Sequence, residues 1–189
     1  NSNNTEFKRK IEKEYPNVEC FLTGENLGYG KANNIGLKKT KTKYALILNP
    51  DTELDSSALE NFLKATETIS NFAIIAPYVQ EEKYQADDIK NLKPISVKNV
   101  KGFAMFLNIS EFENIGFFDE SFFIYFEEID LCKRLIKNNK LIYLIPNIKI
   151  KHFGGRSHNI NFDYEMELSR NWHWMWSTFN YHKKYKGFF

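Results

Sequence analysis

A carboxylate that directly follows an apolar strand is the first feature of this chain that could do chemistry. The run Tyr44–Leu48 predicts a buried strand, and Asn49-Pro50 ends it because proline has no amide hydrogen for a central ladder. Asp51 comes next, with further acids at Glu53 and Asp55. Ligands bind at the carboxyl ends of strands in open α/β sheets, and Mg²⁺ often joins a carboxylate to substrate phosphates. The pattern predicts a metal–diphosphate site, against the alternative of an Asn-Pro-Asp turn with solvated acids.

A second group of acids stands at the start of a predicted helix. The spacing of apolar residues predicts this helix over 129–138, so that Glu127 and Glu128 fall where the helix dipole favours carboxylates. The neighbours of Glu128 are nearly all apolar, and desolvation could raise its pKa and make it a useful general base. The alternative is a charged helix start with ordinary ion pairs to Lys133 or Arg134.

Two further segments carry weaker signals for binding an anion or a metal. Gly24, Gly28 and Gly30 precede a helix predicted over 32–39, where free amides can hold a phosphate, but their spacing fits neither a Rossmann fingerprint nor a P-loop. A structural loop is the alternative there. His152 ends the last predicted strand before a Gly-Gly pair and is well placed to reach a metal, and Arg156 could bind an anionic oxygen. A packed or surface histidine and a solvated arginine are the alternatives.

A regular series of strands and helices must position these groups. Hydrophobic spacing predicts strands at 18–22, 44–48, 72–79, 101–107, 140–145 and 148–153. It predicts helices at 7–15, 32–39, 59–66 and 129–138, with one further helical turn at 110–115. The polar stretch 80–92 is expected to be a surface loop or hairpin.

Composition restricts the class of protein. The 189 residues suit one domain with a real core, and 42% hydrophobic with 26% charged residues indicates a folded, soluble chain. A net charge of +2 is too small to favour a nucleic-acid partner. The two cysteines lack any CxxC or zinc spacing and are expected to be reduced. No transmembrane run and no signal peptide is predicted.

The last part of the chain has a composition of its own. We expect residues 1–160 to form the main domain and residues 161–189 an aromatic and basic helical tail, with Trp172, Trp174 and Trp176 in a helix over 162–185. Tryptophan mixed with lysine suits a membrane interface or a partner surface. The alternative, which we favour slightly, is a helix docked on the core.

Taken together, the ordered motifs resemble family 2 glycosyltransferases of the GT-A fold, most closely rhamnosyltransferase-like members. The motifs that carry the resemblance are 26–36, 48–52, 116–123, 126–134 and 152–157. It implies an α/β fold with a mixed, mostly parallel sheet flanked by helices. It also implies inverting transfer of a sugar, such as rhamnose, from a dTDP- or UDP-linked donor to a glycan or lipid-linked acceptor. A cytoplasmic protein near the inner membrane is the expected setting.

The resemblance also assigns roles to individual residues. Asp51 falls on the position that binds Mg²⁺ or Mn²⁺, and His152 on the histidine that completes that site. The catalytic acid pair falls on Glu127-Glu128, where the family has Glu-Asp, so that Glu128 is the expected base and Asp130 a nearby rival. The donor would be bound by the residues matching the remaining motifs, namely Asn26, Gly28, Lys31, Asn49, Asp51 and Arg156.

One departure from the family concerns its first strand–helix–strand unit, which holds the nucleotide base. Asn1 to Asn4 resemble the loop that follows this unit, so the chain is expected to lack it, as a fragment or as a natural remnant. Its loss would expose a sheet edge, which a homodimer or another segment could cover. A non-catalytic remnant that binds a glycan or a protein is therefore the alternative function.

Overall fold

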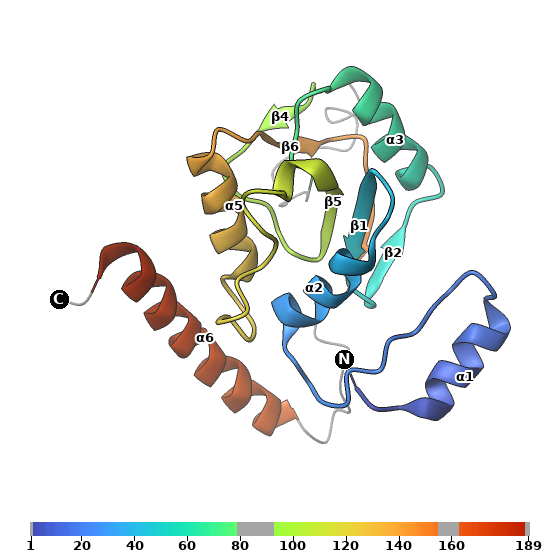
Figure 1. Ribbon diagram of the computed structural model, residues 1–189, viewed down its shortest axis with the longest axis vertical. Helices are drawn as coiled ribbons and strands as arrows, with labels where there is room; N and C mark the ends of the chain where they lie inside the picture. Colours follow the sequence, from blue (N-terminus) through green and yellow to red (C-terminus); the bar gives the residue numbers. More distant parts are fainter. Residues whose placement is uncertain (1, 79–92, 155–162, 188–189) are drawn as a thin grey trace.

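A five-stranded sheet forms the centre of the molecule (Figure 1). The computed structural model describes residues 2–78, 93–154 and 163–187. The strand order is β1-β5-β3-β6-β4, in which the strands span Tyr44–Leu48, Ala104–Asn108, Ile74–Pro77, Ile142–Ile145 and Ile95–Ser96 respectively. Two short strands, β2 (Thr52–Leu54) and β7 (Ile150–His152), form a separate antiparallel ladder.

Helices cover both faces of the central sheet. α2 (Tyr29–Lys39) and α5 (Glu127–Lys137) pack on one face, and α3 (Ala58–Thr68) packs on the other. α1 (Thr5–Glu14) and α6 (Asp163–Lys186) lie outside these layers (Figure 1), and a 3-10 turn spans Ile109–Phe112. Side chains alternate across β5, so that Met105 and Leu107 join one buried cluster with Leu131 of α5, whereas Phe106 joins the other with Phe62 of α3. Because both faces are covered, every residue of β5 is buried. This is the predicted α/β class.

The direction of the strands differs from the expectation. The sheet is mixed, but only β3 and β6 pair in parallel, and the pairings of β5 with β1, of β5 with β3 and of β4 with β6 are antiparallel. The predicted predominance of parallel pairs is therefore wrong for the described strands. Apolar runs show that a strand is buried on two faces, and they do not show its direction.

The predicted strand at 18–22 is also wrong, because this segment is extended but pairs with no described strand. Side-chain hydrogen bonds hold it to α1 instead: Lys8 Nζ donates to Cys20 O and Cys20 N donates to Glu12 Oε1 at 2.8 Å. β1 is half-buried rather than fully buried, since it is an edge strand of the described sheet. An open sheet has two edge strands in any case, so the expected exposure of an edge by a missing unit, and its coverage by a homodimer, stay predictions.

The other predicted helices and strands are confirmed with small shifts in their ends. α2 begins at Tyr29, three residues earlier than the expected start, and α1, α3 and α5 lie where the apolar spacing placed them. β2 and β4 were not predicted, because strands of two or three residues carry no periodic signal. The polar stretch 80–92, predicted as a loop or hairpin, lies wholly outside the described residues.

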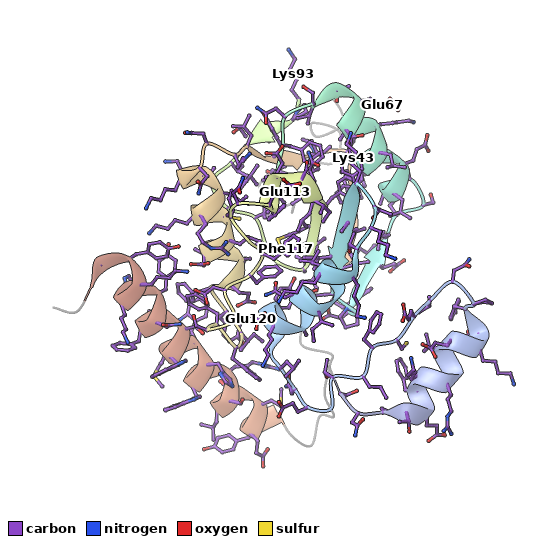
Figure 2. The ribbon with its side chains drawn as sticks, in the orientation of Figure 1. Lys43, Glu67, Lys93, Glu113, Phe117 and Glu120 are labelled. Carbon is purple, nitrogen blue, oxygen red and sulfur yellow. The ribbon has the colours of Figure 1, made fainter. Side chains whose placement is uncertain are left out.

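The loop 115–123 is clamped between α2 and α5, and Figure 2 shows Phe117 and Glu120 on it. From α2, the buried Asn34 amide donates to Phe118 O at 2.9 Å and accepts from Phe118 N at 3.0 Å. From α5, the Arg134 guanidinium donates to the carbonyl oxygens of Ile115, Gly116 and Phe117. The loop therefore enters α5 in a fixed position, with Glu127 as the first residue of that helix.

The start of α2 touches the same loop so closely that only glycine fits. Gly28 has a φ of 79°, and a Cβ there would overlap the carbonyl oxygen of Phe123. We expect Gly28→Ala to lower the free energy of unfolding by at least about 2 kcal/mol through clash and left-handed strain. Gly36→Ala on the same helix is the matched control, because a Cβ there meets nothing within 4 Å and should stabilise by about 0.5–1 kcal/mol. Urea denaturation checks both, and equal effects would contradict this account.

Candidate active site

A carboxylate and an imidazole meet at the end of β1. The β2–β7 ladder pairs Thr52 with His152, and Phe153 N donates to Asp51 O at 3.0 Å. This ladder brings His152 Nε2 to 3.3 Å from Asp51 Oδ1, with both side chains partly exposed. The His152 ring stacks on Phe103, with centroids 4.7 Å apart and planes 6° apart. The two predicted metal ligands are therefore neighbours, although 101 positions separate them in the sequence.

The two adjacent acids of α5 lie in a largely desolvated position. Glu127 is 5% exposed, and its Oε2 is the one buried side-chain polar atom of the described residues that lacks a hydrogen-bond partner. Burial, together with the neighbouring Glu128 charge, raises the pKa of Glu127 to about 7. Burial also raises the pKa of Glu128 above its ordinary value. A buried acid with one unpartnered carboxyl oxygen and a second acid beside it fit a site that exchanges protons.

A short segment before β5 connects these two groups of residues. Tyr29 OH donates to Gly102 O, and a Cβ added at Gly102 would lie 3.5 Å from Tyr29 OH and 3.6 Å from Glu128 Cβ. The ring of the next residue, Phe103, stacks on the His152 ring. The carbonyl oxygen of Phe103 accepts a hydrogen bond from Asn49 N at 2.8 Å. Two consecutive residues thus contact the two groups: Gly102 lies against Glu128, and Phe103 lies against His152 of the Asp51–His152 pair. Sequence reasoning missed this connection, and Gly102 directly before an apolar strand was the only available signal.

Asp130 is fully buried and has a different role from its neighbours. Its carboxylate accepts from Arg134 Nε at 2.7 Å, from Lys184 Nζ at 2.6 Å and from Tyr185 OH at 2.7 Å. A fully buried carboxylate that accepts from two cations and a hydroxyl is held inside the fold by strong charge-assisted hydrogen bonds. The geometry therefore argues against Asp130 as a base and for a structural role, in which it joins α5 to α6.

The turn before α5 is strained, and α6 packs against it. Tyr125 and Phe126 have φ values of 71° and 69°, in the left-handed region that is costly for aromatic residues. The Trp174 ring of α6 contacts both rings, at centroid distances of 5.4 Å and 5.2 Å, and Ser177 Oγ donates to Ile124 O at 2.7 Å. The tail helix is thus docked on the core, as we favoured. Its packing determines the direction in which α5 starts, and hence where Glu127 and Glu128 lie.

The predicted donor-binding residues are more scattered. Asn26 accepts from Gly28 N at 3.1 Å within its own turn, and Lys31 is exposed on α2. Asn49 precedes Asp51 and is bonded to the Phe103 backbone, while Thr52 Oγ1 donates to Asn49 O at 2.6 Å. Arg156 lies outside the described residues. The donor-binding role of all of these stays a prediction.

The Asp51–His152 pair has the chemistry of an incomplete divalent-metal site. One carboxylate oxygen and one imidazole nitrogen suit Mn²⁺, and Mg²⁺ would use mainly the carboxylate. The part of the chain that the structure describes holds no cluster of three or more His, Cys, Asp or Glu side chains. The remaining positions on a cation would therefore fall to water or to donor phosphates, which is the usual arrangement for Mg²⁺.

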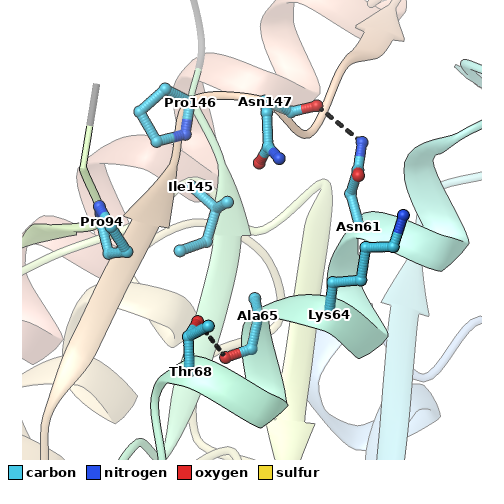
Figure 3. A pocket seen from close by; sticks show the side chains of 8 residues that line it. All are labelled: Asn61, Lys64, Ala65, Thr68, Pro94, Ile145, Pro146 and Asn147. Carbon is cyan, nitrogen blue, oxygen red and sulfur yellow. Dashed lines mark hydrogen bonds between the residues drawn. The ribbon is translucent and has the colours of Figure 1, made fainter. Parts of the chain in front are cut away.

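A pocket of about 220 Å³, with both polar and apolar lining residues, lies between α3 and the end of β6 (Figure 3). Asn61 of α3 lines this pocket and donates a hydrogen bond to Asn147 O, on the other side of it, at 3.0 Å. Other lining residues include Lys64, Thr68 and Pro94. None of the acids described above lines it, so it is separate from the candidate site.

The fold is of the GT-A type, which solved glycosyltransferase structures share. The structure of GalNAc-T7 with UDP, GalNAc and Mn²⁺ superimposes with a TM-score of 0.65, at 14% identity, over 79% of this chain and 35% of that one. At this identity the likeness shows the fold alone.

The sequence then gives the family. The model of glycosyl transferase family 2 matches residues 2–132, and the chain belongs to this family. A hexosyltransferase for low-salt glycan biosynthesis from Haloferax volcanii, Agl10, is 26% identical over 74% of this chain and 52% of its own length. An N-acetylglucosaminyl-diphospho-decaprenol L-rhamnosyltransferase from Mycobacterium tuberculosis is 21% identical over 76% of this chain and 61% of its own. The chain thus spans about half to three-fifths of the length of these relatives.

The raised pKa of Glu127 predicts a pH-dependent stability. An acid whose pKa rises on folding, here from 4.5 to about 7, favours the folded state at low pH and loses that contribution as pH rises. The free energy of unfolding should therefore fall between about pH 4.5 and 7, by up to roughly 3 kcal/mol at 1.36 kcal/mol per pKa unit. Glu127→Gln should flatten this slope in urea titrations across that range. Parallel pH profiles for the variant and the wild type would contradict the assignment.

Proposed function

We propose that this chain carries the catalytic groups of an inverting sugar transfer from a nucleoside-diphosphate donor to a hydroxyl of a glycan or lipid-linked acceptor. Rhamnose is the proposed sugar and dTDP or UDP the proposed nucleotide, in line with the rhamnosyltransferase and hexosyltransferase relatives. The observation that carries the proposal is the segment Gly102-Phe103. Gly102 lies against Glu128 and Phe103 stacks on His152, which supports a single reaction centre shared by the proposed base and the proposed diphosphate site.

The proposed role of Glu128 follows from its environment. Transfer with inversion requires a base that removes the proton of the acceptor hydroxyl while the hydroxyl oxygen attacks the anomeric carbon. The desolvated Glu128 carboxylate has a raised pKa and therefore a higher proton affinity than an exposed glutamate. Glu127, which is more deeply buried, would hold a proton near neutral pH and so limit repulsion between the two acids.

Asp51 and His152 would hold a divalent cation, Mn²⁺ or Mg²⁺, together with the donor diphosphate. A bound cation supplies neutralisation of the negative charge that develops on the leaving diphosphate. The stacking of His152 on Phe103 and the β2–β7 ladder keep the two side chains in place before any ligand binds. Such preorganisation lowers the cost of binding.

Calorimetric titration of dTDP and of UDP, with Mn²⁺ and then with EDTA, tests the diphosphate site. We expect binding that requires Mn²⁺ and that weakens at least about tenfold in Asp51→Ala, since a charged ligand of the cation is lost. Glu53→Ala is the matched control, because Glu53 is an exposed acid two residues further along the same segment. An absence of binding to the well-folded chain would overturn the proposal and favour a non-catalytic module that binds a glycan or a protein.

A further inference from the structure

The side of α6 that faces away from the core carries a stripe of large apolar side chains. Each of its residues has another member three or four positions away, and each is between 48% and 61% exposed; they are Leu168, Trp172, Met175, Trp176 and Phe179. Trp172, Met175, Trp176 and Phe179 line a shallow apolar hollow on the helix surface. Figure 1 shows α6 as the outermost element on its side of the fold. A contiguous apolar stripe of this kind marks an interaction surface.

The opposite side of the helix is already used by the core. His173 stacks on Phe123, Ser177 bonds to Ile124 O, and Lys184 pairs with Asp119 at 2.6 Å. The packing therefore fixes which side of the helix points outward. The exposed stripe is a second face of a helix that is firmly docked, and it does not result from a loose tail.

Charge indicates what this face binds. The last acidic residue of the chain is Glu167, and residues 168–189 contain Arg170, Lys183, Lys184 and Lys186 with no Asp or Glu. Tryptophans prefer the boundary between lipid and water, and neighbouring lysines are attracted to anionic lipids. Among the described residues no helix is long and apolar enough to span a membrane. A helix that lies in the plane of the interface fits this combination.

We propose that the outer face of α6 docks on an anionic lipid surface. The helix then lies flat on the bilayer, with Trp172 and Trp176 at the level of the head groups and with Lys183 and Lys186, which continue the helical spacing of the stripe, against lipid phosphates. Because α6 also packs on the turn before Glu127, docking would hold the acid pair close to the membrane surface. This last point rests on the proposed function and would bring the acids near a lipid-linked acceptor.

Co-sedimentation with vesicles tests the docking. The full chain is mixed with vesicles of phosphatidylcholine alone and of an equal mixture with phosphatidylglycerol, at low and at high salt. We expect binding to the anionic vesicles that weakens with salt, and at least about tenfold weaker binding for the double variant Trp172→Ser, Trp176→Ser. The matched control removes two equally exposed apolar side chains elsewhere, Leu59→Ser with Leu63→Ser on α3. This control should bind like the wild type.

The competing occupant is a second copy of the chain. Two α6 helices side by side and antiparallel would bring the lysines of one near Glu165 and Glu167 of the other. Light scattering that shows a dimer, lost in the tryptophan variant while vesicles bind neither protein, would overturn the lipid proposal. Equal vesicle binding by the wild type and the tryptophan variant would also overturn it. Calorimetric binding of dTDP or UDP by the tryptophan variant reports on the diphosphate site separately, so failure of the two proposals can be told apart.

Discussion

Glu128→Gln is expected to lower turnover by about 100-fold or more while leaving donor binding unchanged. Loss of a general base typically costs this much, and glutamine matches the size of glutamate but cannot take a proton. Because the two side chains have the same size, the substitution should leave no cavity against Gly102. The measurement is release of nucleoside diphosphate from a dTDP- or UDP-linked sugar, alongside calorimetry for donor affinity.

Two further variants make this test specific. Glu128→Asp shortens the side chain by one methylene and restores the Glu-Asp pair that the family resemblance implies, so it should keep a measurable part of the activity. Asp130→Asn keeps the shape of the rival acid and should affect stability more than the chemical step, because Asp130 is already bonded to three groups. Turnover that survives Glu128→Gln but is lost in a stable Asp130→Asn protein would reverse the two roles.

Asp130→Ala is expected to lower the free energy of unfolding by about 3 kcal/mol or more. Removing one partner from a buried ion pair leaves charges without compensation, which typically costs about 3–5 kcal/mol. Asp130 is fully buried and bonds to Arg134 on its own helix and to Lys184 and Tyr185 on α6. The loss should therefore loosen α6 as well, which the fluorescence of its tryptophans would report during urea denaturation.

Tyr185→Phe is the matched control for this prediction. It removes one hydrogen bond to the same carboxylate but keeps both ion pairs and the ring contact with Tyr181, so it should cost only about 1 kcal/mol. Lys184 keeps its ion pair with Asp119 in either variant. The free energy of unfolding lost in Asp130→Ala should therefore lie near the lower end of the range of about 3–5 kcal/mol. Equal stability of Asp130→Ala and the wild type would show that this buried cluster does not hold α6 in place.

Local sequence patterns were sufficient to predict most of the helices and strands. α1, α3 and α5 follow from apolar residues spaced by three and four, and β3, β5 and β6 from short apolar runs. Motif order along the chain also pointed to Asp51, His152 and the acid pair, since the family resemblance depends on the residue types and their sequence spacing. These are properties that lie within short windows of sequence.

Pairing between distant segments could not be predicted in this way. The antiparallel partners of β5, the edge position of β1 and the absence of a strand at 18–22 depend on which segments meet, and apolar runs contain no information on this. The proximity of Asp51 to His152 depends on the β2–β7 ladder, which is too short to leave a periodic signal.

The sequence by itself determined the α/β class, the family and the residue types that could do chemistry. Only the tertiary structure decided which of the acids are available. Asp130 and Glu128 are two residues apart on one helix, yet Asp130 is bonded to cations from α5 and α6, whereas Glu128 lies against Gly102 without a cationic partner among the described residues. Burial and bonding depend on what packs against each side chain, and for these two acids the deciding neighbours are up to 55 residues away in the chain.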